Sequence, residues 1–247
     1  KTLTKDTDYT VSYEKGSGKL GATGKPQDAG TYTVTVTGTG NYMGSKEATF
    51  EIAANAGGFA FNLTDTDQKL TYNGKNQRPA LTVKDGTNPL TEGTDYTLAY
   101  SCNGTAIAAD AEFVNVGSYV IKATGKGNYA GQVAKITVQI APATLTAGSL
   151  TVDSTSFTYD GAPKAPTIES VEAAGVTVEL VRDTHYSVTY VNKADDSVNT
   201  KAPKAAGTYT MRVTGKGNVT GELTVDFTIA ANTVSDLEIS GLVGKVY

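Results

Sequence analysis

The sequence predicts an all-β chain built from tandem antiparallel β-sandwich repeats of about 90 residues. One stretch of 17 residues occurs three times, and each copy alternates apolar and polar residues with the period of two that marks a strand with one buried face. Each copy then ends in a Gly-x-Gly turn. The copies begin at residues 28, 115 and 205 and read DAGTYTVTVTGTGNYMG, NVGSYVIKATGKGNYAG and AAGTYTMRVTGKGNVTG.

A second motif precedes each copy of this stretch in the same phase. It reads LTKDTDYTVSY from residue 3, LTEGTDYTLAY from residue 90 and LVRDTHYSVTY from residue 180. In each, a polar turn leads into an alternating strand, and Asp8, Asp95 or His185 is expected to bond the backbone N–H groups of the turn. Further strands are expected at 50–52, 138–140 and 227–229, which close each repeat, and near 70–72, 79–83, 157–159 and 166–170.

The phase of these motifs predicts the domain organisation. Residue 1 enters the repeat where residue 88 does, so residues 1–53 are expected to form a partial repeat that lacks its first strands. Complete repeats are predicted at 54–141 and 142–231, and residues 232–247 resemble the first strand of a further repeat. Because a half-repeat exposes strand edges, we expect the C-terminal strand of one molecule to complete the N-terminal half-repeat of a neighbour.

The Gly-x-Tyr spacing at Tyr32, Tyr119 and Tyr209 favours an immunoglobulin-like sandwich. In that fold a Tyr near the start of the penultimate strand sends its hydroxyl back to upstream backbone, an arrangement called the tyrosine corner. Asp28 is replaced by Asn115 and Ala205 in the later copies, and the chain has no Cys-Trp-Cys core. The sequence therefore predicts an immunoglobulin-like sandwich without the disulfide of antibody domains.

Composition excludes several classes of protein. The net charge is −4 and the basic residues are scattered, so no concentrated surface for nucleic acid is expected. No apolar run is long enough to insert into a membrane. The single Cys102 forms no intramolecular disulfide and is expected to be a small, half-buried side chain.

The Gly-x-Gly-Asn segment is interpreted as a strand-ending turn whose chemistry is backbone conformation, because Gly and Asn tolerate positive φ. A phosphate loop would open a helix, and none is predicted after it. Tyr42 and Tyr129, which follow the Asn, are candidate ligand-binding residues because an exposed ring can stack on a sugar. Val219 at the matching position of the third copy favours a packing role instead.

Other candidate sites have weaker signals. The acidic pairs Asp6/Asp8, Asp65/Asp67 and Asp195/Asp196 are interpreted as solvated turn residues rather than calcium ligands, with an ion at Asp65 and Asp67 beside a linker as the alternative. His185 is the only His, so a His-ligated metal or a catalytic triad would depend on it alone. Isopeptide bonds between Lys and Asn or Asp stay open. No catalytic residue, metal or cofactor is predicted.

Taken together, the motifs L-x-x-x-T-D-Y-T-V-x-Y, A-G-T-Y-T-V-T-V-T-G-x-G-N-Y-x-G and T-Y-D-G resemble the MBG and YDG-type repeats of bacterial cell-surface proteins. The resemblance implies an extracellular or surface-attached setting and a role in building stalks or in adhesion. It supplies no catalytic residues, so the expected function is a non-enzymatic spacer. The alternatives are a module that binds host or dietary glycan or a surface protein, through a cluster of Phe59, Phe61, Phe113 or Tyr rings, and an accessory domain of a secreted glycan-degrading enzyme.

Overall fold

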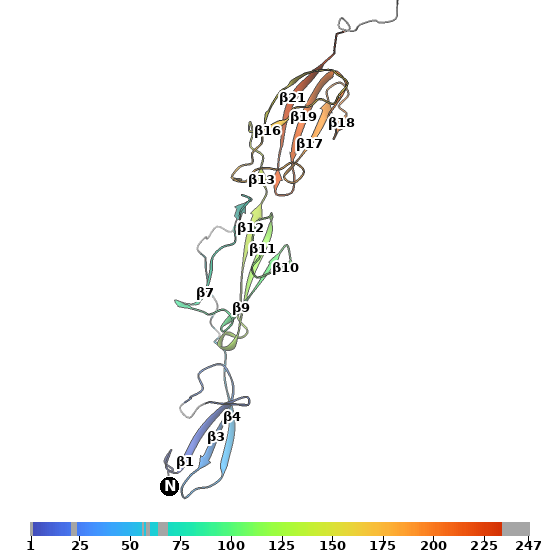
Figure 1. Cartoon of the computed structure of the whole chain (residues 1–247). Coiled ribbons are helices and arrows are strands. Elements are labelled where there is room, and N and C mark those ends of the chain that lie inside the picture. Colours follow the sequence, from blue (N-terminus) through green and yellow to red (C-terminus); the bar gives the residue numbers. More distant parts are fainter. Residues whose placement is uncertain (1, 21–23, 56, 58–59, 64–68, 234–247) are drawn as a thin grey trace, which may run out of the picture. The chain divides into compact units, whose positions relative to one another are not determined.

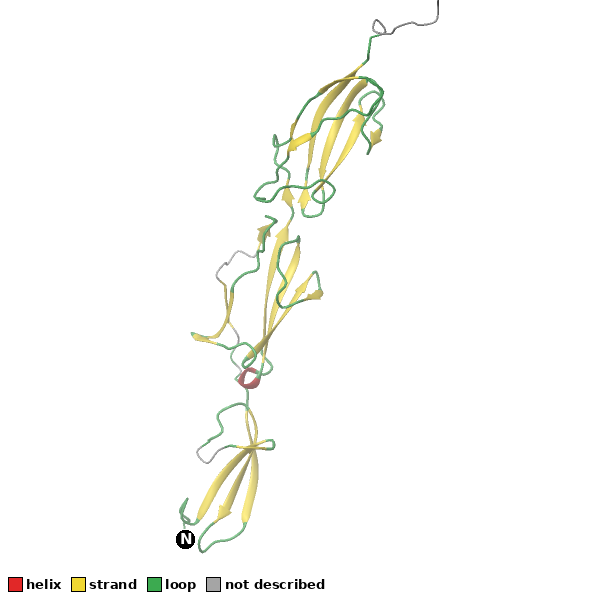
Figure 2. Cartoon of the chain, in the orientation of Figure 1, coloured by secondary structure: helices red, strands yellow, loops and turns green. Residues whose placement is uncertain are grey.

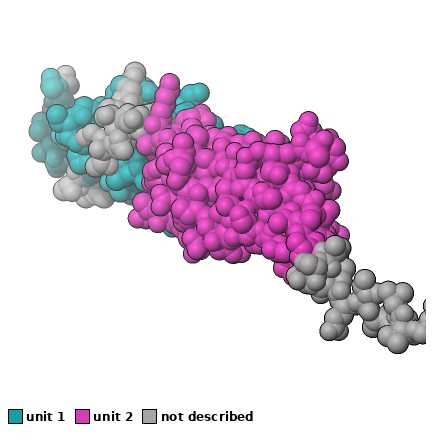
Figure 3. Space-filling model, turned by 90° about the horizontal axis from the view of Figure 1, so that it is seen from above, with its two compact units in different colours: residues 1–68, 78–112, 118–138 teal, residues 69–77, 113–117, 139–247 magenta. Residues whose placement is uncertain are grey.

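A computed structural model describes residues 2–20, 24–55, 57, 60–63 and 69–233 of the chain. The described elements are strands, apart from one short 3-10 helix, η1 (Gly127–Tyr129), and Figure 2 shows how strands and loops alternate along the chain. Two compact units are present, residues 1–68, 78–112 and 118–138 in one and residues 69–77, 113–117 and 139–247 in the other (Figure 3). The first, second and third copies of the repeat are those that contain Tyr32, Tyr119 and Tyr209.

The described part of the first copy is a single antiparallel sheet (Figure 1). Its strand order is β2-β1-β3-β4, and Tyr32 in β3 lies opposite Phe50 in β4. The alternating sequence explains the sheet, because the Thr side chains of β3 project to one face and its Tyr and Val side chains to the other. The bounds are β1 Tyr9–Lys15, β2 Gly18–Lys19, β3 Gly30–Gly38 and β4 Ser45–Ile52.

The second copy has two sheets, as a sandwich requires. One has the order β10-β9-β11-β12-β6 and the other the order β5-β7-β8. Val83 of β7 packs against Tyr96 of β9 and Ala123 of β11, so the sheets share a core. The bounds are β5 Ala60–Leu63, β6 Lys69–Thr71, β7 Leu81–Asp85, β8 Asn88–Pro89, β9 Tyr96–Cys102, β10 Thr105–Ile107, β11 Gly117–Gly125 and β12 Val133–Ala141.

The third copy repeats this plan with a five-stranded sheet, order β15-β21-β19-β17-β18, and a small sheet of β14 and β16. Ile168 of β16 lines a pocket together with Tyr186, Tyr190 and Met211 of the larger sheet. A third pair joins β13, at the start of the copy in sequence, to β20, which follows the Gly-x-Gly-Asn turn near its end. The bounds are β13 Ala143–Thr144, β14 Thr151–Val152, β15 Ser156–Thr158, β16 Ile168–Ser170, β17 Tyr186–Asn192, β18 Val198–Asn199, β19 Gly207–Gly215, β20 Val219–Thr220 and β21 Glu222–Ala230.

The all-β, immunoglobulin-like prediction is confirmed, with one refinement. The edge strand β6 or β15 pairs in parallel with the last strand of its sandwich, β12 or β21. The first and the last strand of each of these sheets run in the same direction and lie side by side, so this edge pair is parallel. Alternation within a strand carries no information on the direction of its partner, and the sequence therefore missed this feature.

The cores are aromatic and aliphatic. In the third copy Phe227 is 2% exposed and stacks on Tyr209, with 5.5 Å between ring centroids. The tyrosine corner is also present, because the Tyr209 hydroxyl donates to the carbonyl of Ala205 at 3.0 Å and the Tyr32 hydroxyl to that of Asp28 at 2.7 Å. The corner fixes the loops that lead into β3 and β19.

Candidate functional site

The Gly-x-Gly-Asn turn has the same structure in the first and third copies. Gly38 N–H donates to the carbonyl of Gly44, and Gly215 N–H to that of Gly221, at 2.9 Å each. A Cβ on Gly215 would lie 2.7 Å from the backbone of Thr220, so the close approach of the two chain segments excludes a side chain there. The second glycine of the motif, Gly217, has a φ of 65°. The predicted turn is therefore confirmed for its glycines.

The lysine of this turn is used inside the repeat. Lys126 Nζ donates to the carbonyl of Gly93 at 2.5 Å, and Lys216 Nζ to that of Asp183 at 2.7 Å. The first copy has Thr39 in this position, and its hydroxyl donates to the carbonyl of Thr7 at 3.0 Å. These contacts tie the turn to the loop before β1, β9 or β17, which agrees with a structural turn rather than a phosphate loop.

The turn before that strand is capped by the residue that the motif predicts. Asp8 accepts from the N–H of Thr4, and Asp95 from that of Thr91, both at 2.8 Å. His185 replaces them in the third copy, and its Nδ1 accepts from Val181 N–H at 2.8 Å. An accepting Nδ1 places the ring proton of the neutral imidazole on Nε2. The predicted local role of these three residues is confirmed.

The two candidate ligand-binding tyrosines have different surroundings. Tyr129 is half-buried, and its hydroxyl donates to Asp85 at 3.3 Å. Burial, followed by the charge of Asp85, raises the pKa of Tyr129. Tyr42 lines a shallow groove of about 570 Å³ beside Leu3 and Met43, the latter 96% exposed. Val219 at the matching position is buried. The position therefore packs in the third copy, bonds Asp85 in the second, and borders an open groove in the first.

The remaining candidates do not converge on a site within the described residues. Asp65, Asp67 and Phe59 lie outside these residues, and no group of three or more His, Cys, Asp or Glu side chains gathers among those that the structure describes. Phe113 is fully buried and belongs to the core, so it does not contribute to an exposed aromatic cluster of the kind that the binding-module alternative requires. Cys102 is half-buried.

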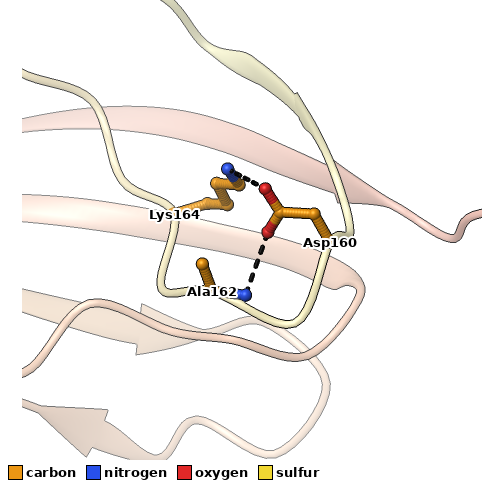
Figure 4. A network of polar contacts seen from close by, with 3 residues as sticks. All are labelled: Asp160, Ala162 and Lys164. Carbon is orange, nitrogen blue, oxygen red and sulfur yellow. Dashed lines mark hydrogen bonds and ion pairs between the residues drawn. The ribbon is translucent and has the colours of Figure 1, made fainter.

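Asp160 of the T-Y-D-G motif anchors a turn in the third copy (Figure 4). One carboxylate oxygen accepts from Ala162 N–H at 2.9 Å, and the other from Lys164 Nζ at 2.6 Å. The hydrogen bond from Lys164, followed by that from Ala162, lowers the pKa of Asp160. Lys193 and Asp226 form a second Lys–Asp ion pair in this copy. Both pairs are partly exposed, as ordinary surface ion pairs are.

The structure also gives a role to the Asn of the Gly-x-Gly-Asn turn, which the sequence treated as a residue of positive φ. Among the described residues, positive φ outside glycine occurs at Asp6, Asn103, Asp183 and Asp196. Asn128 and Asn218 instead direct their side chains at the loop of the preceding copy. The signal in the sequence was the recurrence of Asn in all three copies, at a position where the backbone does not require it.

These features define tandem immunoglobulin-like repeats with a shared turn motif. Residues 1–56 match the family model of the MBG domain, which confirms the resemblance over that stretch. No curated protein matches the sequence. Within the described residues, no helix has the length and apolar character needed to cross a membrane.

Solved structures of tandem domains align with the chain over most of its length, at low identity and low TM-score. The three N-terminal domains of the Hoc outer capsid protein of bacteriophage RB49 are 14% identical, with 92% of this chain and 89% of that one covered and a TM-score of 0.32. Sidekick-1 immunoglobulin domains 1–5 are 11% identical, with 91% and 52% covered and a TM-score of 0.33. Protocadherin gamma B2 cadherin domains 3–6 are 12% identical, with 90% and 66% covered and a TM-score of 0.26.

Proposed function

We propose that this chain is a non-enzymatic spacer region of a bacterial cell-surface or secreted adhesin-like protein. Its repeats would hold another part of that protein at a distance from the cell. The MBG match at residues 1–56 and the immunoglobulin-like fold support an extracellular repeat module of this kind.

The observation that carries the proposal is the bonding of the linker backbone to the copy that follows it. Asn55 N–H donates to the carbonyl of Asn128 at 2.5 Å, and Ala143 N–H donates to that of Asn218 at 3.1 Å. Ala143 and Thr144 also pair with β20 as a parallel strand. A linker whose N–H groups are bonded to the next domain has lost most of the freedom of a flexible coil. A spacer needs that loss, because a freely jointed array folds back on itself.

The side chains that the sequence offers to a ligand support the same proposal. Asp8, Asp95 and His185 cap turns, and Lys126 and Lys216 bond backbone carbonyls. Tyr129 donates to Asp85. These groups are engaged in the fold, and His185 Nε2 also lies 3.5 Å from the hydroxyl of Tyr72 in the second copy.

We further propose that the partner of the first copy is a strand from a neighbouring molecule. Phe50 and Val36 are both 38% exposed in the first copy, whereas their counterparts Phe227 and Val213 are 2% and 0% exposed in the third. The apolar face is thus the same in sequence, but among the described residues Phe50 and Val36 stay partly exposed whereas their counterparts in the third copy are buried. Residues 232–247 of another molecule, which resemble the start of a repeat, are the proposed cover.

Binding measurements test the spacer proposal against the alternative of a glycan- or protein-binding module. The chain would be applied to arrays of host and plant glycans, mucin and matrix proteins, with and without calcium. The spacer proposal predicts no specific binding. Micromolar binding that survives moderate salt and is lost in Tyr42→Ala would instead establish an adhesive module at the open groove. Light scattering tests the strand exchange, because a mass that stays monomeric at all concentrations contradicts it.

A further inference from the structure

The side chain of Asn128 joins two successive copies of the repeat inside the first compact unit. Its Oδ1 accepts from the N–H of Ala29, and its Nδ2 donates to Oδ1 of Asp28 at 3.0 Å. Asp28 and Ala29 open the loop before β3 of the first copy, whereas Asn128 lies in the turn after β11 of the second. About 100 residues of chain separate the partners, so this is a tertiary contact and not a local turn bond.

The second compact unit contains the same contact between the next two copies. Asn218 Oδ1 accepts from the N–H of Val116 at 2.8 Å, and Asn218 Nδ2 donates to Oδ1 of Asn115 at 2.8 Å. Asn115 and Val116 occupy the positions of Asp28 and Ala29 in the repeat. The two contacts agree group by group, although the residue that accepts from Nδ2 is a carboxylate in one and an amide in the other.

Elementary chemistry fixes the orientation of both Asn amides. A backbone N–H can only donate, so the amide atom that faces Ala29 or Val116 must be the oxygen. The NH2 group then faces the side chain at position 28 or 115, which must accept. The carboxylate of Asp28 can only accept, and the carbonyl of an Asn amide can do so as well. Asp and Asn therefore both fit this position, and an aliphatic residue does not.

Both partners are held in place by their own copies. In the first copy the carbonyl of Asp28 accepts the hydroxyl of Tyr32, so the tyrosine corner holds the residue whose side chain meets Asn128. On the other side, the backbone carbonyl of Asn128 accepts from the linker residue Asn55, as that of Asn218 does from Ala143. Each Asn thus bonds the preceding copy through two side-chain groups and the linker through its carbonyl. Preorganised partners lose little conformational entropy when the contact forms.

Exposure distinguishes the three Asn residues in the way that this contact requires. Asn128 and Asn218 are half-buried, whereas Asn41, in the same turn of the first copy, is exposed. In the third copy, Ala205 stands where the first two copies have Asp28 and Asn115, so the third loop offers only the backbone half of the contact.

We propose that the Gly-x-Gly-Asn turn is a docking surface for the Asp/Asn-x-Gly-x-Tyr loop of another repeat of the same type. The turns at Asn128 and Asn218 are occupied by the loops at Asp28 and Asn115. The turn at Asn41 presents the same surface to such a loop with Asp or Asn at its first position. This recognition holds whether the array serves as a spacer or binds a ligand, and so it goes beyond the proposed function.

Exchange of the polar groups at the first contact tests the proposal in the full chain. Asn128→Asp keeps the acceptor for Ala29 N–H but sets a second carboxylate against Asp28, and the contact should open. Asp28→Asn alone should be tolerated, because the side-chain oxygen of Asn115 accepts the equivalent hydrogen bond in the second contact. The double variant restores a donor opposite an acceptor and should recover the wild-type behaviour.

The readout is the distance between two spin labels, one on each side of the contact. Lys46→Cys and Lys135→Cys provide exposed attachment points, in a chain whose native thiol is removed by Cys102→Ser. The wild type, Asp28→Asn and the double variant should give one narrow distribution, and Asn128→Asp a broad one. Asn41→Asp is the matched control, with the same substitution in the same turn, and should leave the distribution narrow.

Two results would overturn the proposal. One is a narrow distribution in Asn128→Asp, since the contact would then not hold the copies together. The other is a broad distribution in Asn128→Asp that stays broad when Asp28→Asn is added, or that Asn41→Asp also produces. Asn128 would then act only within its own turn. A circular dichroism spectrum of each variant verifies that the sheets are retained. A ligand found on the glycan array would change the proposed function without changing either result.

Discussion

Replacement of Phe227 by Ala should destabilise the third copy by about 3–5 kcal/mol, the usual cost of removing a buried Phe. Phe227 is 2% exposed, stacks on Tyr209 and makes edge contacts with Phe157 and Tyr190 at 6.1 and 6.2 Å between centroids. Such ring pairs contribute about 0.5–1.5 kcal/mol each beyond their buried area. Because a domain of this size has a stability of only about 5–15 kcal/mol, the loss should be large enough to measure without difficulty.

The matched variant is Phe50→Ala at the same position of the first copy. Phe50 also stacks on a tyrosine, Tyr32, at 5.6 Å, and has an edge contact with Tyr13 at 6.3 Å, but it is 38% exposed. A fully buried Phe contributes about 1.5–3 kcal/mol by area, so about three fifths of that contribution, or about 1–2 kcal/mol, is expected here. Tyr32 and Tyr13 match Tyr209 and Tyr190, but Phe157 of the edge strand β15 has no counterpart in the described part of the first copy. The difference between the variants therefore measures the burial that the third copy adds through β15 and its second sheet.

Urea unfolding followed by hydrogen exchange and mass spectrometry assigns each loss to its copy. At high dilution, where no neighbouring molecule covers the first copy, Phe50→Ala should cost less than Phe227→Ala, and equal losses there would contradict the exposure of Phe50. Equal losses would mean that the apolar face of β3 and β4 is buried in solution. Repeating the pair at high dilution distinguishes burial within the chain from burial against a neighbouring molecule, because only the latter is lost on dilution.

Three further predictions concern single polar contacts. Tyr209→Phe removes the hydroxyl that donates to Ala205 and should lower the stability of the third copy by about 0.5–1.5 kcal/mol in urea unfolding, with no loss if the corner is unimportant. His185→Asp should preserve stability, since Asp caps the same turn in the other copies, whereas His185→Ala should lower the melting temperature; equal effects would contradict the capping role. Because the folded-state pKa of Asp160 is lowered, its contribution to stability is complete above the ordinary carboxyl pKa of about 4 and is lost as pH falls through the folded-state pKa. Lys164→Met should reduce this acid sensitivity in melting curves, and an unchanged pH profile would exclude the contact as its source.

The sequence predicted the parts of the fold that depend on local chemistry. Alternation around Tyr32, Tyr119 and Tyr209 placed the long strands, and the Gly-x-Tyr spacing predicted a hydroxyl bond that the structure contains at Tyr32 and Tyr209. The turn caps were predicted because the groups of Asp8 and Asp95 reach backbone only four residues away. Both partners of such a short-range interaction lie in one repeat, so the sequence of that repeat is enough to predict it.

The features that the sequence missed depend on partners from other parts of the chain. Asn128 and Asp28 are about 100 residues apart, and nothing in either motif states that they meet. The turn motif also had a sufficient local explanation, since Gly127 does adopt positive φ, and that explanation was extended to an Asn that does not. The exchange of Asp28 for Asn115 and Ala205 was visible, but was interpreted as a departure from the tyrosine-corner motif rather than as variation at a contact.

The prediction of ligand-binding residues was limited in the same way, because it also depends on partners from other parts of the chain. An aromatic ring after a Gly-rich turn has the same sequence whether it meets a sugar or a neighbouring Asp, and the hydrogen bond from Tyr129 to Asp85 is visible only in three dimensions. The Val at position 219 was the one signal that favoured packing, and it is buried in the structure. Tyr42 stays a candidate because it borders the open groove of the first copy.

The contacts at Asn128 and Asn218 each join two successive copies, and backbone ¹⁵N relaxation of the full chain tests this most directly. If the contacts hold, amides in the strands of joined copies should report a common correlation time, longer than that of an independent domain of about 90 residues. If each copy instead tumbles with the shorter correlation time of such a domain, the copies are flexibly linked and the Asn contacts do not hold them together.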